Sequence, residues 1–183
     1  MSKKYNNPEI ESSYRLNDLG FTLYEIVRQY KPEKIVEFGV LHGYSTVAMA
    51  MALQDNKRGR IYAYDIWTKY PYKNAKMSET ATNIALHGVG EQVELLIGDC
   101  DSWEPELVDF IVLDIGNDGT IIKKYYEKWK DYCKFLIFEG GSLERDEVDW
   151  MLKYDKKPIR DCGVDYAILN SKFPSVSIIK CNL

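Results

Sequence analysis

Short apolar runs alternate with amphipathic segments along most of the chain. Five runs are rich in Ile, Val, Leu, Phe and Tyr and show little polar alternation, as expected for strands that are covered on both faces. These runs are residues 34–38, 60–64, 93–97, 110–113 and 134–138. Apolar residues recur at helical spacing in residues 18–30, 45–53, 78–87, 121–132 and 145–153. The alternation predicts an α/β fold with a mostly parallel sheet.

The end of the chain departs from this pattern. Two strand-like runs, residues 166–169 and 175–180, have only residues 170–174 between them. That gap is too short for a crossover helix, so the two strands must be antiparallel. We therefore expect a parallel sheet that ends in an antiparallel hairpin.

The composition is that of a folded domain. A chain of 183 residues, with 45% hydrophobic and 28% charged residues, is long and apolar enough to bury a core, which excludes disorder as its main state. We expect residues 1–17 to be a polar N-terminal segment that is mobile to about Ser13, and residues 18–183 to form a single domain. Asn17 or Asp18 is the expected N-cap of the first helix.

Charge and cysteine content narrow the partners and the location. The net charge of −4 argues against a nucleic-acid binder. No apolar run approaches the roughly 18 residues of a membrane span, and the first residues lack the apolar stretch of a secretory signal. The four cysteines form no CxxC pair. We expect a cytoplasmic protein that does not bind membranes and whose partner is a small molecule.

A carboxylate stands at or beside the end of each predicted parallel strand. The five residues are Glu37, Asp65, Asp99, Asp114 and Glu139. Ligands of open α/β sheets bind outside the carboxyl ends of the strands, and five acids on one edge would repel one another unless ligands, donors or cations used them. The alternative is that these acids cap helices or face water. We favour a ligand site at this edge.

The segment after the first strand has the features of a nucleoside-binding turn. Gly39 permits a tight turn, Gly43 lets the backbone approach a ligand, and the N–H groups that open the next helix suit an anion. Asp65 follows about 20 residues later, the usual place for an acid that binds ribose hydroxyls. Leu41 stands where a nicotinamide-dinucleotide fingerprint has its middle glycine, which argues against that cofactor.

These motifs together resemble the class I S-adenosylmethionine-dependent methyltransferases. The likeness is closest to the branch with catechol and macrolide-sugar O-methyltransferases and cephalosporin-hydroxylase-like proteins. The residues that carry it are 36–39, 43–45, 64–65, 97–99 and 110–114, in the family's order. The resemblance implies a Rossmann-like three-layer sandwich, with a seven-stranded sheet whose last strand is reversed, and S-adenosylmethionine as the cofactor.

The resemblance also assigns the cofactor site. It places Ser45 near the carboxylate of the cofactor's methionine end, Glu37 near the amino-acid portion, and Asp65 on the ribose hydroxyls. Trp67 either packs on the adenine or ribose or belongs to the core. The expected cofactor-binding residues are Glu37, Gly39, Gly43, Tyr44, Ser45, Asp65, Ile66, Trp67, Asp99, Cys100 and Asp114.

A hydroxyl acceptor must have its pKa lowered, and a divalent cation held by carboxylates can do this. In the resembled branch, acids after the fourth and fifth strands hold such a metal. This implies Asp114 and Glu139 as catalytic residues and as ligands of Mg²⁺ or another divalent cation. The third ligand usually follows the second directly, but Gly140 stands there in this chain. Asn117 or Asp118, in the loop after Asp114, are the candidates to replace it.

Two more residues are candidates for contact with the acceptor. His42 lies inside the glycine turn, where it could act as a base or bond to neighbouring backbone. Arg145 could bind an acceptor carboxylate or phosphate, or it could pair with Glu144 or Asp149.

The sequence thus predicts an S-adenosylmethionine-dependent methyltransferase that acts on a small molecule, at a hydroxyl group. One alternative is a degenerate protein that binds the cofactor or a nucleoside without catalysis, and the other is a nicotinamide-dependent oxidoreductase. Little chain is left beyond the sheet and its helices. The acceptor pocket must then come from strand-end loops, from the N-terminal segment, or from the partner subunit of a homodimer.

Overall fold

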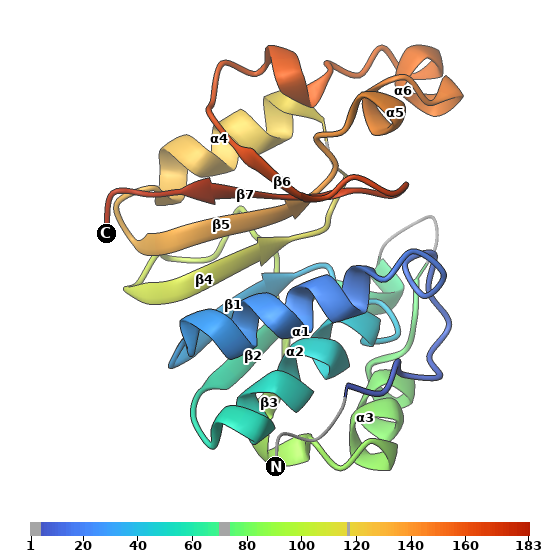
Figure 1. Cartoon of the computed structure of the whole chain (residues 1–183), viewed down its shortest axis with the longest axis vertical. Helices are drawn as coiled ribbons and strands as arrows, with labels where there is room; N and C mark the ends of the chain where they lie inside the picture. Colours follow the sequence, from blue (N-terminus) through green and yellow to red (C-terminus); the bar gives the residue numbers. More distant parts are fainter. Residues whose placement is uncertain (1–4, 70–73, 117) are drawn as a thin grey trace. The chain divides into compact units, whose positions relative to one another are not determined.

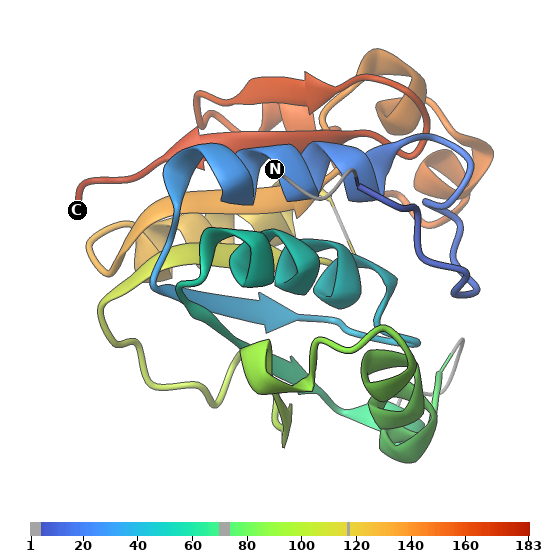
Figure 2. The same ribbon diagram turned by 60° about the horizontal axis from the view of Figure 1, so that its bottom comes forward.

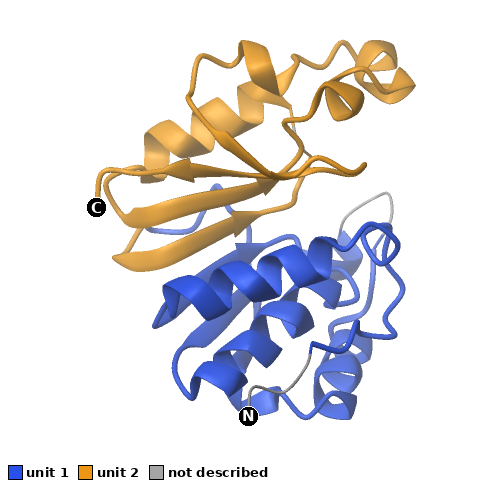
Figure 3. Ribbon diagram, in the orientation of Figure 1, with its two compact units in different colours: residues 1–104 blue, residues 105–183 orange. Residues whose placement is uncertain are grey.

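The computed structural model describes residues 5–69, 74–116 and 118–183 (Figure 1). The chain divides into two compact units, residues 1–104 and 105–183 (Figure 3). Each unit combines strands with helices, as an α/β fold requires. Within the described ranges, no helix is both long and apolar enough to cross a membrane. A single domain over residues 18–183 stays a prediction.

Three parallel strands form the sheet of the first unit. They are β1 (Lys34–Phe38), β2 (Arg60–Asp65) and β3 (Val93–Ile97), and β2 pairs with both of the others. The helices and short 3₁₀ turns of this unit are α1 (Leu19–Tyr30), α2 (Tyr44–Asn56), α3 (Met77–Leu86), η1 (Trp67–Lys69) and η2 (Gly90–Gln92). All three strands and the first three helices that the sequence predicts are present, with ends that differ by at most three residues.

Helix α2 is the most buried helix of the first unit. Nine of its residues are buried, on several sides of the helix, because α1 packs along it and β2 lies beneath it (Figure 2). Polar contacts join the ends of α1 and α2. The Tyr24 hydroxyl donates to Asp55 Oδ2 at 2.6 Å, and Arg28 Nη1 donates to Asn56 Oδ1 at 2.6 Å.

The N-terminal segment packs on α1, which differs from the mobile segment that we expected. Ile10 is buried, and the ring of Tyr5 lies 5.1 Å from that of Tyr24. The apolar side chains in this mostly polar stretch explain the packing. Asp18 occupies the N-cap position of α1, and Oδ1 of the preceding residue, Asn17, accepts the N–H of Leu19 at 3.1 Å.

The second unit contains four strands and confirms the predicted antiparallel hairpin. Strands β4 (Val108–Leu113) and β5 (Cys133–Glu139) are parallel. Strand β7 (Val176–Lys180) runs antiparallel to β5 on one side and to β6 (Ala167–Asn170) on the other. The described residues thus hold seven strands, the number that the resemblance implies.

The helices of the second unit differ from the prediction at one place. Its helical elements are α4 (Gly119–Trp129), α5 (Leu143–Asp146), α6 (Asp149–Lys153) and the 3₁₀ turn η3 (Ile159–Asp161). The single helix expected over residues 145–153 is wrong, because Val148 has an extended backbone that separates α5 from α6. The buried carboxylate of Asp146 fixes this break: it accepts the N–H groups of Ile159 and Arg160, at 2.9 and 3.3 Å.

Candidate functional site

The carboxyl ends of β1, β2 and β3 meet at one edge of the first unit. Beyond the last paired residues, the N–H of Gly39 donates to the carbonyl of Tyr64, and the N–H of Gly98 donates to the carbonyl of Asp65, both at 3.1 Å. The loops after the three strands therefore start side by side. Most of the predicted cofactor-binding residues lie on these loops or at the strand ends, which is where ligands bind in open α/β sheets.

Glu37 is a buried anchor for the first turn of α2. Its side chain is fully buried, and its two carboxylate oxygens accept the hydroxyls of Ser45, at 2.5 Å, and Thr46, at 2.6 Å. A buried carboxylate is costly unless donors surround it, and hydrogen bonds to a charged group contribute about 1.5–3 kcal/mol. Glu37 thus joins the end of β1 to the start of α2. The hydroxyl of Ser45 donates to Glu37, and the expected place of Ser45 near the cofactor's carboxylate stays a prediction.

The glycine turn depends on left-handed backbone conformations. Gly39 and Gly43 have φ values of 87° and 85°, and Leu41 between them has 51°. A Cβ at Gly43 would also come within 2.8 Å of Thr80 Cγ2. Gly43 occupies the N-cap position of α2 and, as a glycine, has no side chain to cap the helix. The N–H groups of its first turn, which have no partners inside the helix, are thereby suited to an anionic group such as a carboxylate.

Asp65 holds the glycine turn from the neighbouring strand. Its Oδ2 accepts the N–H groups of Val40, at 2.8 Å, and Leu41, at 2.9 Å. Its Oδ1 accepts the N–H of Trp67 at 2.7 Å. A carboxylate has about four accepting positions, so these three bonds leave little capacity for other donors. Asp65 therefore acts first on the backbone, and its contact with ribose hydroxyls stays a prediction.

Helix α3 supplies two residues that sequence reasoning missed. Thr80 Oγ1 donates to the carbonyl of Leu41 at 2.5 Å, and Asn83 Nδ2 donates to the carbonyl of His42 at 2.9 Å. The two residues share one face of α3 because they are three positions apart. Thr80 is fully buried, and a buried polar residue on a helix face requires a partner. The sequence shows the polar residue but not its partner, which lies 39 positions away.

The residues expected around the adenine and ribose differ in exposure. Trp67 is only 5% exposed, and its indole N–H donates to the carbonyl of Leu96 at 3.3 Å, which favours the core-packing alternative. Ile66 is half-buried, Asp99 is exposed and Cys100 is buried. Asp99 Oδ1 accepts the N–H of Asp101 at 2.6 Å. These residues lie on loops that start side by side, and their contacts with a cofactor stay predictions.

Tyr44, at the start of α2, contacts the N-terminal segment. Its hydroxyl donates to Asn7 Oδ1 at 2.7 Å, and burial raises the pKa of this hydroxyl. The Tyr44 hydroxyl therefore ties the helix after the glycine turn to the segment before α1.

The second unit carries Asp114 and Glu139 at the carboxyl ends of its two parallel strands. Leu113 of β4 pairs with Phe138 of β5, so the two acids follow at matching positions. Asp114 is half-buried and Glu139 is buried. Both oxygens of Glu139 accept hydrogen bonds from Arg145, one from Nε and one from Nη2, the latter at 3.1 Å. Arg145 therefore pairs with Glu139, and not with Glu144 or Asp149 as the sequence suggested.

The described residues do not fit a divalent cation at Glu139. The guanidinium of Arg145 uses both oxygens of Glu139 that a metal would need. The carboxylate of Asp118 caps α4, accepting the N–H groups of Thr120 and Ile121 at 2.8 and 3.0 Å. The other candidate, Asn117, lies outside the described residues. Within the part of the chain that is described, no three His, Cys, Asp or Glu side chains are grouped so as to hold a metal ion.

Comparison with known proteins shows the family and the fold of the chain. Residues 36–136 match a family model described as a methyltransferase domain. No curated protein matches the chain. Its fold is shared by solved structures, which confirms the expected Rossmann-like fold.

Three of the similar structures are methyltransferases with a bound cofactor or product. PaMTH1 from Podospora anserina, bound to SAH, is 18% identical, with 94% of this chain and 80% of that chain covered and a TM-score of 0.63. The O-methyltransferase from Bacillus cereus, in complex with SAH, is 19% identical, with coverages of 96% and 84% and a TM-score of 0.60. TomG from Streptomyces achromogenes, an O-methyltransferase of tomaymycin synthesis in complex with SAM, is 16% identical, with coverages of 96% and 83% and a TM-score of 0.59.

Proposed function

The chain belongs to the methyltransferase-domain family, and from this premise we propose that it transfers the methyl group of S-adenosylmethionine to a hydroxyl group of a small molecule. The observation that carries the proposal is the glycine turn of the first unit. Asp65 and Thr80 hold this turn from two sides, and it leads into a helix whose N-cap residue, Gly43, has no side chain of its own. The arrangement fits a ligand with an anionic amino-acid end.

Different residues of the first unit contact different parts of the cofactor in this proposal. The first turn of α2 receives the carboxylate of the cofactor's methionine end, and Glu37 keeps that turn in place through Ser45 and Thr46. Asp65 lies between the glycine turn and the turn at Trp67, beside the place of the ribose. The half-buried side chain of Ile66 offers an apolar surface to the ribose or adenine. Bound S-adenosylmethionine supplies a methyl group on a positively charged sulfur.

Methyl transfer also needs an acceptor that is aligned with the methyl group and shielded from water. The acceptor oxygen forms a bond to the methyl carbon while the carbon–sulfur bond breaks, and the hydroxyl proton leaves to a base. His42 is our candidate for this base, because Asn83 fixes the backbone at His42 within the glycine turn. We propose a small-molecule acceptor, action in the cytoplasm and assembly as a homodimer as further expectations.

Calorimetric titration with S-adenosylmethionine and S-adenosylhomocysteine, each with Mg²⁺ or with EDTA, tests the proposal. We expect binding in the micromolar range that EDTA does not change. Transfer of labelled methyl groups to a panel of phenols, sugars and hydroxylated metabolites then tests the reaction. Binding without transfer to any acceptor would favour the non-catalytic alternative, and the absence of binding would contradict the proposed cofactor site.

A further inference from the structure

Arg145 carries a buried donor that the rest of the second unit does not use. Its side chain is 7% exposed, and its Nε and Nη2 donate to Glu139. Its Nη1 is buried and has no hydrogen-bond partner among residues 5–69, 74–116 and 118–183. A buried donor without an acceptor costs about 1–3 kcal/mol, and more when the group is charged. The unpaired Nη1 donor therefore indicates that a bound ligand supplies its hydrogen-bond acceptor.

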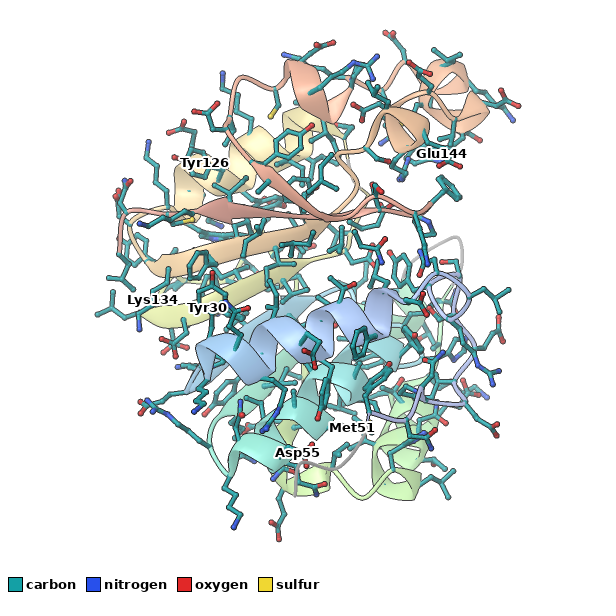
Figure 4. The ribbon with its side chains drawn as sticks, in the orientation of Figure 1. Tyr30, Met51, Asp55, Tyr126, Lys134 and Glu144 are labelled. Carbon is teal, nitrogen blue, oxygen red and sulfur yellow. The ribbon has the colours of Figure 1, made fainter. Side chains whose placement is uncertain are left out.

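The surroundings of Arg145 are those of a ligand site. It pairs with Glu139 at the carboxyl end of β5, the edge at which open α/β sheets bind ligands. The half-buried ring of Trp150 lies over the guanidinium, with its centroid 4.5 Å from Cζ. Lys156 Nζ lies 5.7 Å from the same ring and pairs with Asp118 Oδ2 at 3.4 Å. Glu144, the neighbour of Arg145 on α5, is exposed and does not neutralise it (Figure 4).

We propose that Arg145 Nη1 binds the carboxylate group of a small organic acid at the carboxyl end of β5. A guanidinium suits a carboxylate because its planar N–H groups match the oxygens in geometry and charge. Glu139 fixes the orientation of the guanidinium and so leaves the Nη1 side for the acid.

The charge around Arg145 favours a carboxylate over a phosphate. Glu139 already compensates the guanidinium, and Asp114 follows β4 at the matching position of the same edge. A phosphate would bring close to two negative charges to this edge, whereas a carboxylate brings one. Since Nη1 is enclosed, the side chains over it must move when the acid binds. Trp150 is the aromatic side chain that lies over the guanidinium, on the short helix α6.

A nuclear magnetic resonance titration of the full chain tests this site without knowledge of the natural acid. Benzoate is the carboxylate probe and inorganic phosphate is the comparison. The signals observed are the guanidinium of Arg145, identified by its loss in Arg145→Lys, and the indole N–H of Trp150. We expect benzoate to shift both signals in a saturable way. Phosphate should shift neither of them.

Three variants sharpen the test. Arg145→Lys keeps a positive charge beside Glu139 but removes the planar set of guanidinium N–H donors, including Nη1. Benzoate should then no longer shift the Trp150 signal. Arg160→Lys is the matched control, because Arg160 pairs with Asp146 in the same unit and is more exposed; here the benzoate shifts should persist. Glu139→Gln should bind benzoate several-fold more tightly, since the compensating charge is gone.

The outcomes separate this inference from the proposed function. Unshifted Arg145 and Trp150 signals at high benzoate would overturn the carboxylate site, even if S-adenosylhomocysteine binds in a parallel titration. Saturable shifts with phosphate alone would overturn the choice of a carboxylate. Benzoate binding that Arg145→Lys leaves unchanged would place the site elsewhere.

Discussion

The carboxylate of Asp65 accepts the backbone N–H of Leu41 at 2.9 Å, so the acid after the second strand holds the turn after the first. The resemblance assigns Asp65 to the ribose of the cofactor and the glycine turn to its methionine end. In the structure they form one unit, because the same carboxylate also bonds to Val40 and Trp67. A change at Asp65 should therefore affect the shape of the glycine turn as well as any direct contact with a ligand.

Asp65→Asn tests this coupling. The amide keeps one accepting oxygen, but its NH₂ group would face backbone N–H donors. We expect a loss of about 2 kcal/mol in the free energy of unfolding, since hydrogen bonds to a charged acceptor are lost. We also expect weaker binding of S-adenosylhomocysteine by at least about tenfold. Urea unfolding and calorimetry measure the two effects.

Asp99→Asn is the control for Asp65→Asn. Asp99 also follows a strand of the first unit, but its side chain is exposed and bonds only to its own turn among the contacts resolved for it. We expect little change in stability. Equal losses of stability in the two variants would show that Asp65 has no special role in the glycine turn.

Thr80→Val tests the support that α3 gives to the same turn. The change removes the donor to the carbonyl of Leu41 and leaves the shape of the side chain nearly intact. We expect about 1–2 kcal/mol of destabilisation and weaker binding of S-adenosylhomocysteine, because a buried carbonyl loses its partner. Thr82→Val is the matched control: Thr82 is exposed, and its hydroxyl bonds within α3 to the carbonyl of Ser78. Unaltered cofactor binding in Thr80→Val would remove Thr80 from the site.

Elements with strong local patterns could be predicted from the sequence, and contacts between distant residues could not. The strand runs and the antiparallel hairpin were predictable because apolar clusters and short gaps allow few arrangements. The break between α5 and α6 was not, since it depends on bonds from Asp146 to residues 159 and 160. Helical spacing alone made residues 145–153 read as one helix.

The pairing of Arg145 is another contact that could not be predicted from the sequence. Local charge pairing suggests Glu144 or Asp149, whereas the structure pairs Arg145 with Glu139. The turn between them makes this possible, because Gly140 and Gly141 have φ values of 112° and 99°, which L residues rarely adopt. The sequence shows the two glycines but not the direction in which they turn the chain.

Gly20→Ala should destabilise the protein, although the same change usually stabilises a helix. A Cβ at Gly20 would clash with the hydroxyl of Tyr5 and come within 2.6 Å of the hydroxyl of Tyr44. We expect a loss of about 1–3 kcal/mol from overpacking, in place of a gain of about 0.5–1 kcal/mol. Tyr5→Phe and Tyr44→Phe, each combined separately with Gly20→Ala in a double-mutant cycle, should reduce the loss in the free energy of unfolding. A stabilised Gly20→Ala variant would contradict the contact of the N-terminal segment with α1 and α2.

Alkaline pH should weaken the first unit through Tyr24. Burial and the hydrogen bond to Asp55 raise the pKa of Tyr24 to about 12 (Asp55 is labelled in Figure 4). The folded state thus keeps the proton at pH values where the unfolded state, with a pKa near 10, loses it. The contribution is fully present below pH 10 and is lost as the pH rises towards 12, a change on the order of 2 kcal/mol.

Tyr24→Phe isolates this contribution. The variant should be less stable at pH 8, because it lacks the hydrogen bond to Asp55, and its stability should fall less steeply above pH 10. Urea unfolding between pH 8 and 11 measures both. Tyr30→Phe, at the exposed end of the same helix, should keep the wild-type slope. Parallel pH profiles for the wild type and Tyr24→Phe would contradict the raised pKa.

Divalent cations should have no saturable site at Glu139, because a guanidinium and a metal ion compete for the same two oxygens. We expect electron paramagnetic resonance of Mn²⁺ to show no micromolar binding to the wild type, and the binding of S-adenosylhomocysteine to be the same with Mg²⁺ and with EDTA. Stoichiometric Mn²⁺ binding that Glu139→Gln abolishes would contradict this. Mn²⁺ binding that Asp114→Asn abolishes and Glu139→Gln leaves intact would instead place a cation at Asp114 without the help of Glu139.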